Sequence, residues 1–113
     1  TVDLKMNGAS PFVDAARIYA LQCGVAETNT LARLRGAAAA LGIPSPEVEA
    51  WTRAFLFIQL ARLRHQQACR REGRAMNNRI NPYELNELDR LTLKEAFRQA
   101  RKLQSRLALD YQL

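Results

Sequence analysis

The stretch from Trp51 to Arg71 reads WTRAFLFIQLARLRHQQACRR, and it determines how we expect the rest of the chain to be arranged. Its middle, Ala54 to Leu63, is apolar on almost every side except at Gln59 and Arg62. A helix that is apolar nearly all round is normally covered by its neighbours. The sequence therefore predicts a central helix buried in a bundle, with a polar cluster where this helix leaves the core.

Capping and terminating residues on both sides of this stretch predict three further helices. Ser10, Ser45 and Asn86 are expected to cap helices, and Gly24, Gly42 and Gly73 to end them. Thr1 to Gly8 is expected to be an extended lead-in. The four expected helices run from Ser10 to Cys23, from the Thr28–Thr30 triplet to Leu41, from Ser45 to about Glu72, and from Asn86 to about Asp110.

Apolar residues at helical spacing give each outer helix a side that faces the core. The first carries Phe12, Ala16, Tyr19, Ala20 and Cys23; the second Leu31, Leu34, Ala38 and Leu41; the last Leu93, Ala96, Phe97, Ala100, Leu103, Leu107 and Tyr111. No segment alternates as a strand would. We therefore expect an all-α protein, a four-helix antiparallel bundle with two shorter helices then two long ones, forming a single domain over residues 1–113.

The charge of the chain is +6, and fourteen of its seventeen basic residues are arginine. Arginine suits bidentate contact with phosphate or carboxylate groups, although solvated helix surfaces also carry many arginines. Nucleic acid is not the expected partner, because the basic ridge of the last helix lacks interleaved aromatic residues. That ridge is a candidate interaction surface for an acidic partner and comprises Lys94, Arg98, Arg101, Lys102 and Arg106.

Two isolated cysteines, Cys23 and Cys69, are expected to be free thiols in a reducing cytoplasm. No signal peptide or membrane span is apparent, so we expect a cytoplasmic protein without membrane contact. The chain starts at Thr1 without methionine, and we expect it to be part of a longer protein.

Motifs for catalysis are absent from the sequence. The His65 and Cys69 pair has the spacing of two metal ligands on one helix turn, but a metal needs further ligands, and we expect none. Instead, His65 is expected to be hydrogen-bonded at the edge of the core or to contact a ligand. Helix dipoles account for the acidic pairs Glu47/Glu49 and Glu87/Asp89. No catalytic residue, metal or cofactor is therefore expected within this domain.

Four separated segments resemble the nucleotidyltransferase substrate-binding domain family of bacteria. They are PFVDAARIYAL from Pro11, TxTLARLR from Thr28, FLFIQLARLRHQ from Phe55 and NPYELNELDRLTLKEAFRQARKLQ from Asn81. The resemblance covers nearly the whole chain. It implies a helical bundle that forms the C-terminal module of a multidomain signalling protein, often with CBS and cyclic-nucleotide-binding domains upstream.

The resemblance also implies a division of labour. An upstream nucleotidyltransferase domain would hold Mg²⁺ and a nucleoside triphosphate, and this domain would help present the nucleotide or a protein acceptor. The family's recurrent polar positions fall on Arg17, Arg62, Arg64, His65, Gln66 and Asn78, which are the candidate substrate-binding residues.

The segment from Arg74 to Leu85 is expected to be a structured loop whose asparagines bond to its own backbone. Related chains often have Pro-Asp-Asn and Asp-Pro here, whereas this chain has Met76-Asn77-Asn78 and Asn81-Pro82, so amides replace two carboxylates. The first functional hypothesis is a non-catalytic substrate-binding or regulatory domain. The alternative is a helical interaction or dimerisation module that docks on its own copy or on sensor domains.

Overall fold

A computed structural model describes residues 1–112 and contains four long helices. They are α1 (Ser10–Cys23), α2 (Thr30–Leu41), α3 (Ser45–Arg71) and α4 (Glu87–Tyr111). Four short elements complete the described chain: strands β1 (Val2–Asp3) and β2 (Arg79–Ile80), the π-helical turn η1 (Lys5–Ala9) and the 3-10 turn η2 (Pro82–Glu84).

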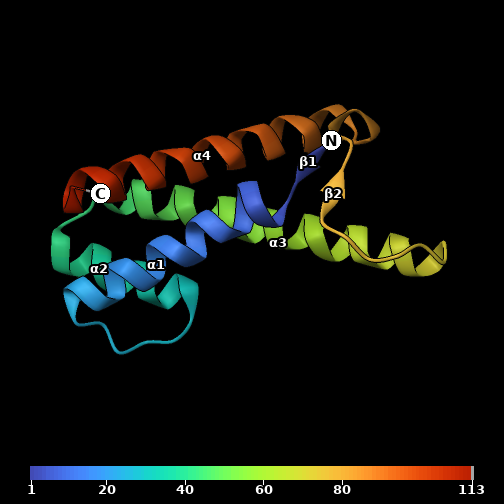
Figure 1. Cartoon of the computed structure of the whole chain (residues 1–113). Helices are drawn as coiled ribbons and strands as arrows, with labels where there is room; N and C mark the ends of the chain where they lie inside the picture. Colours follow the sequence, from blue (N-terminus) through green and yellow to red (C-terminus); the bar gives the residue numbers. More distant parts are fainter. Residues whose placement is uncertain (113) are drawn as a thin grey trace.

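The two longest helices, α3 and α4, run antiparallel beside each other, and the shorter α1–α2 hairpin packs against one half of this pair (Figure 1). Helix α1 contacts α4, whereas α2 packs mainly on α1. The other half of α3 extends beyond the hairpin and is accompanied by the returning loop and β2 (Figure 1). The predicted all-α four-helix fold is confirmed.

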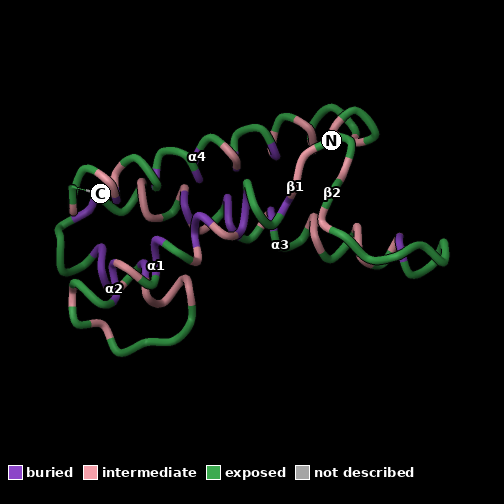
Figure 2. Tube along the Cα trace, in the orientation of Figure 1, coloured by how far each residue is buried: buried purple, intermediate pink, exposed green. Residues whose placement is uncertain are grey.

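The core lies between α1, α3 and α4, where burial is concentrated (Figure 2). Trp51, Phe55 and Ile58 of α3 pack there with Phe12 and Tyr19 of α1. The predicted inner face of α4 is confirmed for Leu93, Ala96, Ala100, Leu103 and Leu107, which are all buried, and Phe97 and Tyr111 are partly buried against the core. On α2, Leu34 and Ala38 are buried, but the prediction for Leu41 was wrong, because this side chain is 45% exposed beside the terminating glycine.

One expectation about the central helix was also wrong. Leu56, Leu60 and Leu63 are 52%, 41% and 52% exposed, so α3 is not covered on every side. The hairpin and η1 cover one side of α3 and α4 covers a second. No segment within residues 1–112 covers the third side, where these leucines lie.

Helix starts follow the predicted chemistry only in part. Asn29 and Asn86 cap α2 and α4 with their side chains, but Ser10 and Ser45 cap nothing. Ser10 cannot act as a cap because the chain before it is already helical in η1, whose first turn is held by Asp3: its Oδ1 accepts the backbone N–H groups of Lys5 and Met6. The expected extended lead-in is therefore limited to β1.

The start of the chain is tied to the loop after α3. Strands β1 and β2 pair antiparallel, and the backbone N–H of Leu4 donates to the carbonyl of Asn78 at 2.7 Å. Gly8 lets η1 approach the core closely, because a Cβ at this position would lie 2.9 Å from the Phe97 ring and 3.0 Å from Ile58. This packing holds β1 beside β2 and so positions the loop.

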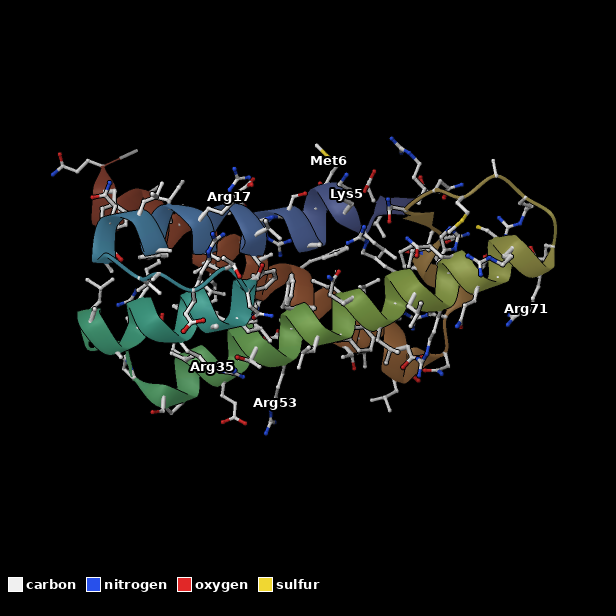
Figure 3. The ribbon with its side chains drawn as sticks, turned by 90° about the horizontal axis from the view of Figure 1, so that it is seen from below. Lys5, Met6, Arg17, Arg35, Arg53 and Arg71 are labelled. Atoms are coloured by element: carbon white, nitrogen blue, oxygen red, sulfur yellow. The ribbon has the colours of Figure 1, made fainter. Side chains whose placement is uncertain are left out.

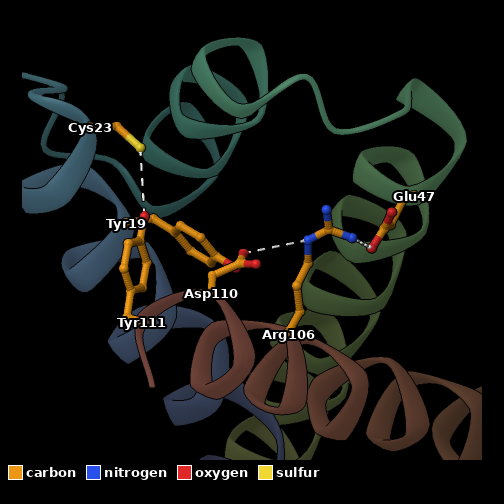
Figure 4. A network of polar contacts seen from close by, with 6 residues as sticks. All are labelled: Tyr19, Cys23, Glu47, Arg106, Asp110 and Tyr111. Carbon is orange, nitrogen blue, oxygen red and sulfur yellow. Dashed lines mark hydrogen bonds and ion pairs between the residues drawn. The ribbon is translucent and has the colours of Figure 1, made fainter. Parts of the chain in front are cut away.

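Polar contacts fasten the opposite end of α4 (Figure 4). The hydroxyl of Tyr19 donates to Asp110 at 2.8 Å, and Arg106 forms an ion pair with Glu47 of α3 at 2.7 Å. Burial, together with the hydrogen bond to Asp110, raises the pKa of Tyr19 above its usual value. The C-terminal turns of α4 are thus attached to both α1 and α3.

Candidate functional site

A polar cleft of about 480 Å³ lies where the second half of α3 meets the following loop and the start of α4. Phe57, Ala61, Ala68, Ile80 and Leu85 give it an apolar floor. Its polar walls are formed by Arg64, His65, Glu72, Arg74, Arg79, Asn81, Glu84 and Asp89. The cleft therefore combines apolar surface with several charged groups, as ligand sites commonly do.

Three guanidinium groups line this cleft in different states of pairing. Arg74 donates from Nε to Glu72 at 2.6 Å, and Arg64 lies 4.0 Å from Asp89. The guanidinium of Arg79 makes no hydrogen bond or ion pair within residues 1–112. Since guanidinium groups bind phosphate and carboxylate bidentately, Arg79 and the weakly paired Arg64 are the cationic groups available to an anionic ligand.

The loop that forms one wall is fastened to α3 by side chains. Arg62 donates from Nε to Oδ1 of Asn78 at 3.0 Å, and His65 Nε2 lies 3.0 Å from Oδ1 of Asn77. Asn77 Oδ1 also accepts the backbone N–H of Arg79, and Asn81 Oδ1 accepts that of Tyr83. The predicted bonding of loop asparagines to the loop backbone is confirmed for Asn77 and Asn81, whereas the side chain of Asn78 bonds to Arg62 instead.

The candidate residues from the sequence fall into three groups. Arg64 and His65 line the cleft, while Arg62 and Asn78 bond to each other and hold the loop beside it. Gln66 is half-buried on α3 and makes no side-chain hydrogen bond within residues 1–112. Arg17 is exposed on α1, and Figure 3 shows it far from Arg71 at the end of α3, so the structure does not bring it to the cleft.

Several charged residues of the cleft were not singled out from the sequence, among them Arg74, Arg79 and Asp89. Arg74 and Arg79 lie in a loop whose shape depends on the distant pairing with β1. Asp89 looked like a helix-dipole residue, and it does accept a hydrogen bond from the capping Asn86, yet it also faces Arg64. No local signal identifies this second contact.

The His65 and Cys69 pair has an explanation without metal. Cys69 Sγ lies 3.6 Å from His65 Nε2, at hydrogen-bonding distance, and the thiol is fully buried. Among residues 1–112, no three His, Cys, Asp or Glu side chains are grouped so that they could hold a metal ion. His65 is thus placed at the edge of the helix packing with a hydrogen bond to the loop.

The ridge on α4 is only partly free. Arg98 forms a bidentate pair with Glu95, and Arg106 is half-buried against Glu47. The side chains of Lys94, Arg101 and Lys102 have no ion pair within residues 1–112. These three residues are the ones that remain available for an external acidic group.

Comparison with known protein families gives one match, which extends over residues 1–111. The family is described as "Putative nucleotidyltransferase substrate binding domain". The chain belongs to this family. A search of curated proteins found no relative, and a search of solved structures found no similar fold. No helix within residues 1–112 is both long and apolar enough to cross a membrane.

Proposed function

We propose that this domain is the non-catalytic substrate-binding and regulatory module of a bacterial signalling nucleotidyltransferase. It would present the nucleotide or the acceptor to a catalytic domain elsewhere in a longer cytoplasmic protein. Family membership supports the general role. Mg²⁺ and the nucleoside triphosphate would be held by the catalytic domain.

The observation that carries this proposal is the cleft lined by Arg64, Arg74 and Arg79. Glu72 holds Arg74 in place, whereas Arg79 is unpaired within residues 1–112 and Arg64 is paired only at 4.0 Å. A phosphate or carboxylate can therefore bind Arg64 and Arg79 without displacing a strong internal ion pair. The acids Glu84 and Asp89 would accept hydrogen bonds from hydroxyl or amino groups of the same ligand.

Titration of the chain with ATP, UTP and cyclic AMP in the absence of Mg²⁺, followed by amide chemical shifts, tests the proposal. Shifts are expected to cluster at residues 62–66 and 77–81. Arg79→Ala should weaken binding about tenfold, as loss of a charged hydrogen bond does. Arg35→Ala, which removes an exposed arginine from α2, is the matched control and should bind as the unmodified chain does.

Absence of shifts at millimolar nucleotide would exclude nucleotide binding by this cleft and leave a protein acceptor as its ligand. In that case, Arg64→Ala is expected to abolish transfer in the full-length enzyme while the helical content of the domain is unchanged. A loss of folding in Arg64→Ala would instead assign this arginine a structural role.

A second candidate function is a docking module for sensor domains or for another copy. The observation that favours it is the set of unpaired cations on α4, namely Lys94, Arg101 and Lys102. An acidic partner surface would relieve their mutual repulsion. Replacing these three residues by glutamine should reduce the salt dependence of assembly in the full-length protein, and unchanged salt dependence would exclude the ridge as the docking surface.

A further inference from the structure

On the outward side of α3, a regular row of residues is exposed because no other segment within residues 1–112 packs over it. We name this row the outer stripe. Successive members are separated by alternating steps of four and three residues, and every one is exposed: Glu49, Arg53, Leu56, Leu60, Leu63, Gln67 and Arg70. An average step of 3.5 residues is the spacing at which one helix packs along another.

The centre of the outer stripe is apolar. Leu56, Leu60 and Leu63 are 52%, 41% and 52% exposed and occupy consecutive positions of the stripe. Other exposed leucines, such as Leu21 on α1, are isolated and need no explanation. Consecutive leucines on one helix face, in contrast, form a continuous surface that a second helix can cover.

A shallow groove of about 750 Å³ between α3 and α4 widens this apolar surface. Small side chains leave the space open, because Ala50 and Ala54 of α3 face Ala96 of α4 across it. Leu91, which is 54% exposed, lies at its edge on α4. The apolar area is therefore broader than the stripe alone.

Charges at the two ends of α3 indicate the direction of the covering helix. Glu49 lies at the N-terminal end, where it also pairs with Arg53 at 3.0 Å, and Arg70 and Arg71 lie at the C-terminal end. A parallel second α3 would bring the two arginine-bearing ends together, whereas an antiparallel one brings each of these ends to Glu49 of the other copy. Glu49 and Arg71 are equally distant from Leu60 along the helix, so antiparallel packing about that leucine brings Glu49 of one copy near Arg71 of the other.

We propose that the outer stripe is a homodimer interface in which the α3 helices of two copies pack antiparallel about a two-fold axis near Leu60. A two-fold interface uses the same surface on both subunits, and this arrangement packs leucines on leucines and places Glu49 near Arg71. The leucines supply the affinity, since burial of apolar surface is the main favourable contribution to protein association. The exposed charges set the register rather than the affinity.

Sedimentation equilibrium of the chain over micromolar to millimolar concentrations tests whether it dimerises. The unmodified chain should form a dimer, and Leu60→Glu should be monomeric with unchanged helical circular dichroism. Leu21→Glu introduces the same charge at an exposed leucine of α1 and should remain dimeric. An unmodified chain that stays monomeric at millimolar concentration, or a dimer unaffected by Leu60→Glu, would overturn the proposal.

A charge exchange tests the antiparallel arrangement. Glu49→Arg and Arg71→Glu should each raise the dimer dissociation constant about fivefold, as lost surface ion pairs of up to about 1 kcal/mol do. The double variant should restore it. Within one copy the two residues are about 33 Å apart along the helix, too far to interact, so restoration requires contact between copies. If the effects of the two substitutions on the dimer dissociation constant instead add in the double variant, Glu49 and Arg71 do not meet across the interface. The proposed arrangement would then be wrong.

This dimer does not depend on substrate binding in the cleft, because Arg79 and the loop lie outside the outer stripe. Arg79→Ala should therefore leave the dimer dissociation constant unchanged. Likewise, if Arg79→Ala does not bind nucleotide, the result of the sedimentation equilibrium experiment is unchanged.

Discussion

Arg62 on α3 donates a hydrogen bond from Nε to Oδ1 of Asn78, 3.0 Å away, across sixteen positions of sequence. Its Nη1 donates to Oε1 of Gln59 at the same distance. The resemblance to the substrate-binding domain family marks both Arg62 and Asn78 as candidate ligand residues. In the structure they bond to each other, and the bond holds the wall of the cleft in place.

Asn78→Ala removes this bond and should loosen the loop without unfolding the helices. A net loss of about 1 kcal/mol is typical for one such hydrogen bond, so amide exchange at residues 75–81 should accelerate about fivefold. The Leu4–Asn78 backbone bond remains, which limits the effect. Gln67→Ala, at an exposed position of α3, is the control. Equal amide exchange rates at residues 75–81 in both variants would mean that the Arg62–Asn78 bond does not hold the loop in place.

The buried Tyr19 predicts a loss of stability at alkaline pH. Burial first, and then the hydrogen bond to Asp110, raise the pKa of Tyr19 above its usual value of about 10. The folded state therefore holds the phenolic proton more tightly than the unfolded state. The resulting stabilisation is fully present below pH 10 and is lost as the pH rises toward the folded-state pKa.

Denaturant unfolding between pH 8 and pH 11.5, followed by the emission of the buried Trp51, measures this loss. The unmodified chain should lose about 1.4 kcal/mol of unfolding free energy per pH unit above 10 through Tyr19. Tyr19→Phe should be less stable at pH 8 but should show a shallower decline. Tyr83→Phe, at an 82% exposed tyrosine, serves as the control and should decline as steeply as the unmodified chain.

The ion pair between Arg106 and Glu47 should contribute more to stability than the other pairs on α4. Their side chains are only 34% and 30% exposed, and the pair joins α4 to α3 at 2.7 Å. Arg106→Ala is expected to lower the unfolding free energy by about 1–2 kcal/mol, because Glu47 then loses its half-buried partner. Thermal or denaturant unfolding measures the change.

Arg98→Ala is the matched comparison for Arg106→Ala. Arg98 pairs with Glu95 on the same helix, and both side chains are more than half exposed. Such pairs contribute about 0.5 kcal/mol or less, so Arg98→Ala should have little effect. Equal destabilisation by the two substitutions would mean that Arg106 does not have the bridging role.

The helices and most of their buried faces could be predicted because their signals are local. Asn29, Asn86, Gly24 and Gly42 act at the helix ends through their own side chains or backbone conformation. Ser10 misled the prediction because its capping chemistry is overridden by the helical turn η1 before it. That turn is stabilised by tertiary packing, which a sequence pattern does not contain.

The exposure of Leu56, Leu60 and Leu63 could not be predicted for a related reason. An all-round apolar helix requires covering, but the sequence does not say whether the covering segment belongs to the same chain. For the cleft, Arg64 and His65 were identified by resemblance. Arg79 was not, because its position depends on the pairing of β2 with β1, far away in sequence.

Gly8 should tolerate no larger side chain, because η1 crosses α3 and α4 at close range. A Cβ at this position would lie 2.9 Å from the Phe97 ring and 3.0 Å from Ile58, which is fully buried and cannot move aside. Gly8→Val should therefore lower the unfolding free energy by about 1–3 kcal/mol, the usual cost of overpacking.

Because η1 also positions β1, the variant should accelerate amide exchange at Arg79 and Ile80 as well. Gly36→Val is the comparison. The three atoms nearest to its Cβ would all belong to Val25, a half-buried loop residue that can shift, so the pairing of β1 with β2 should be unaffected. If amide exchange in β2 becomes faster in both variants, or in neither, η1 does not position the wall of the cleft.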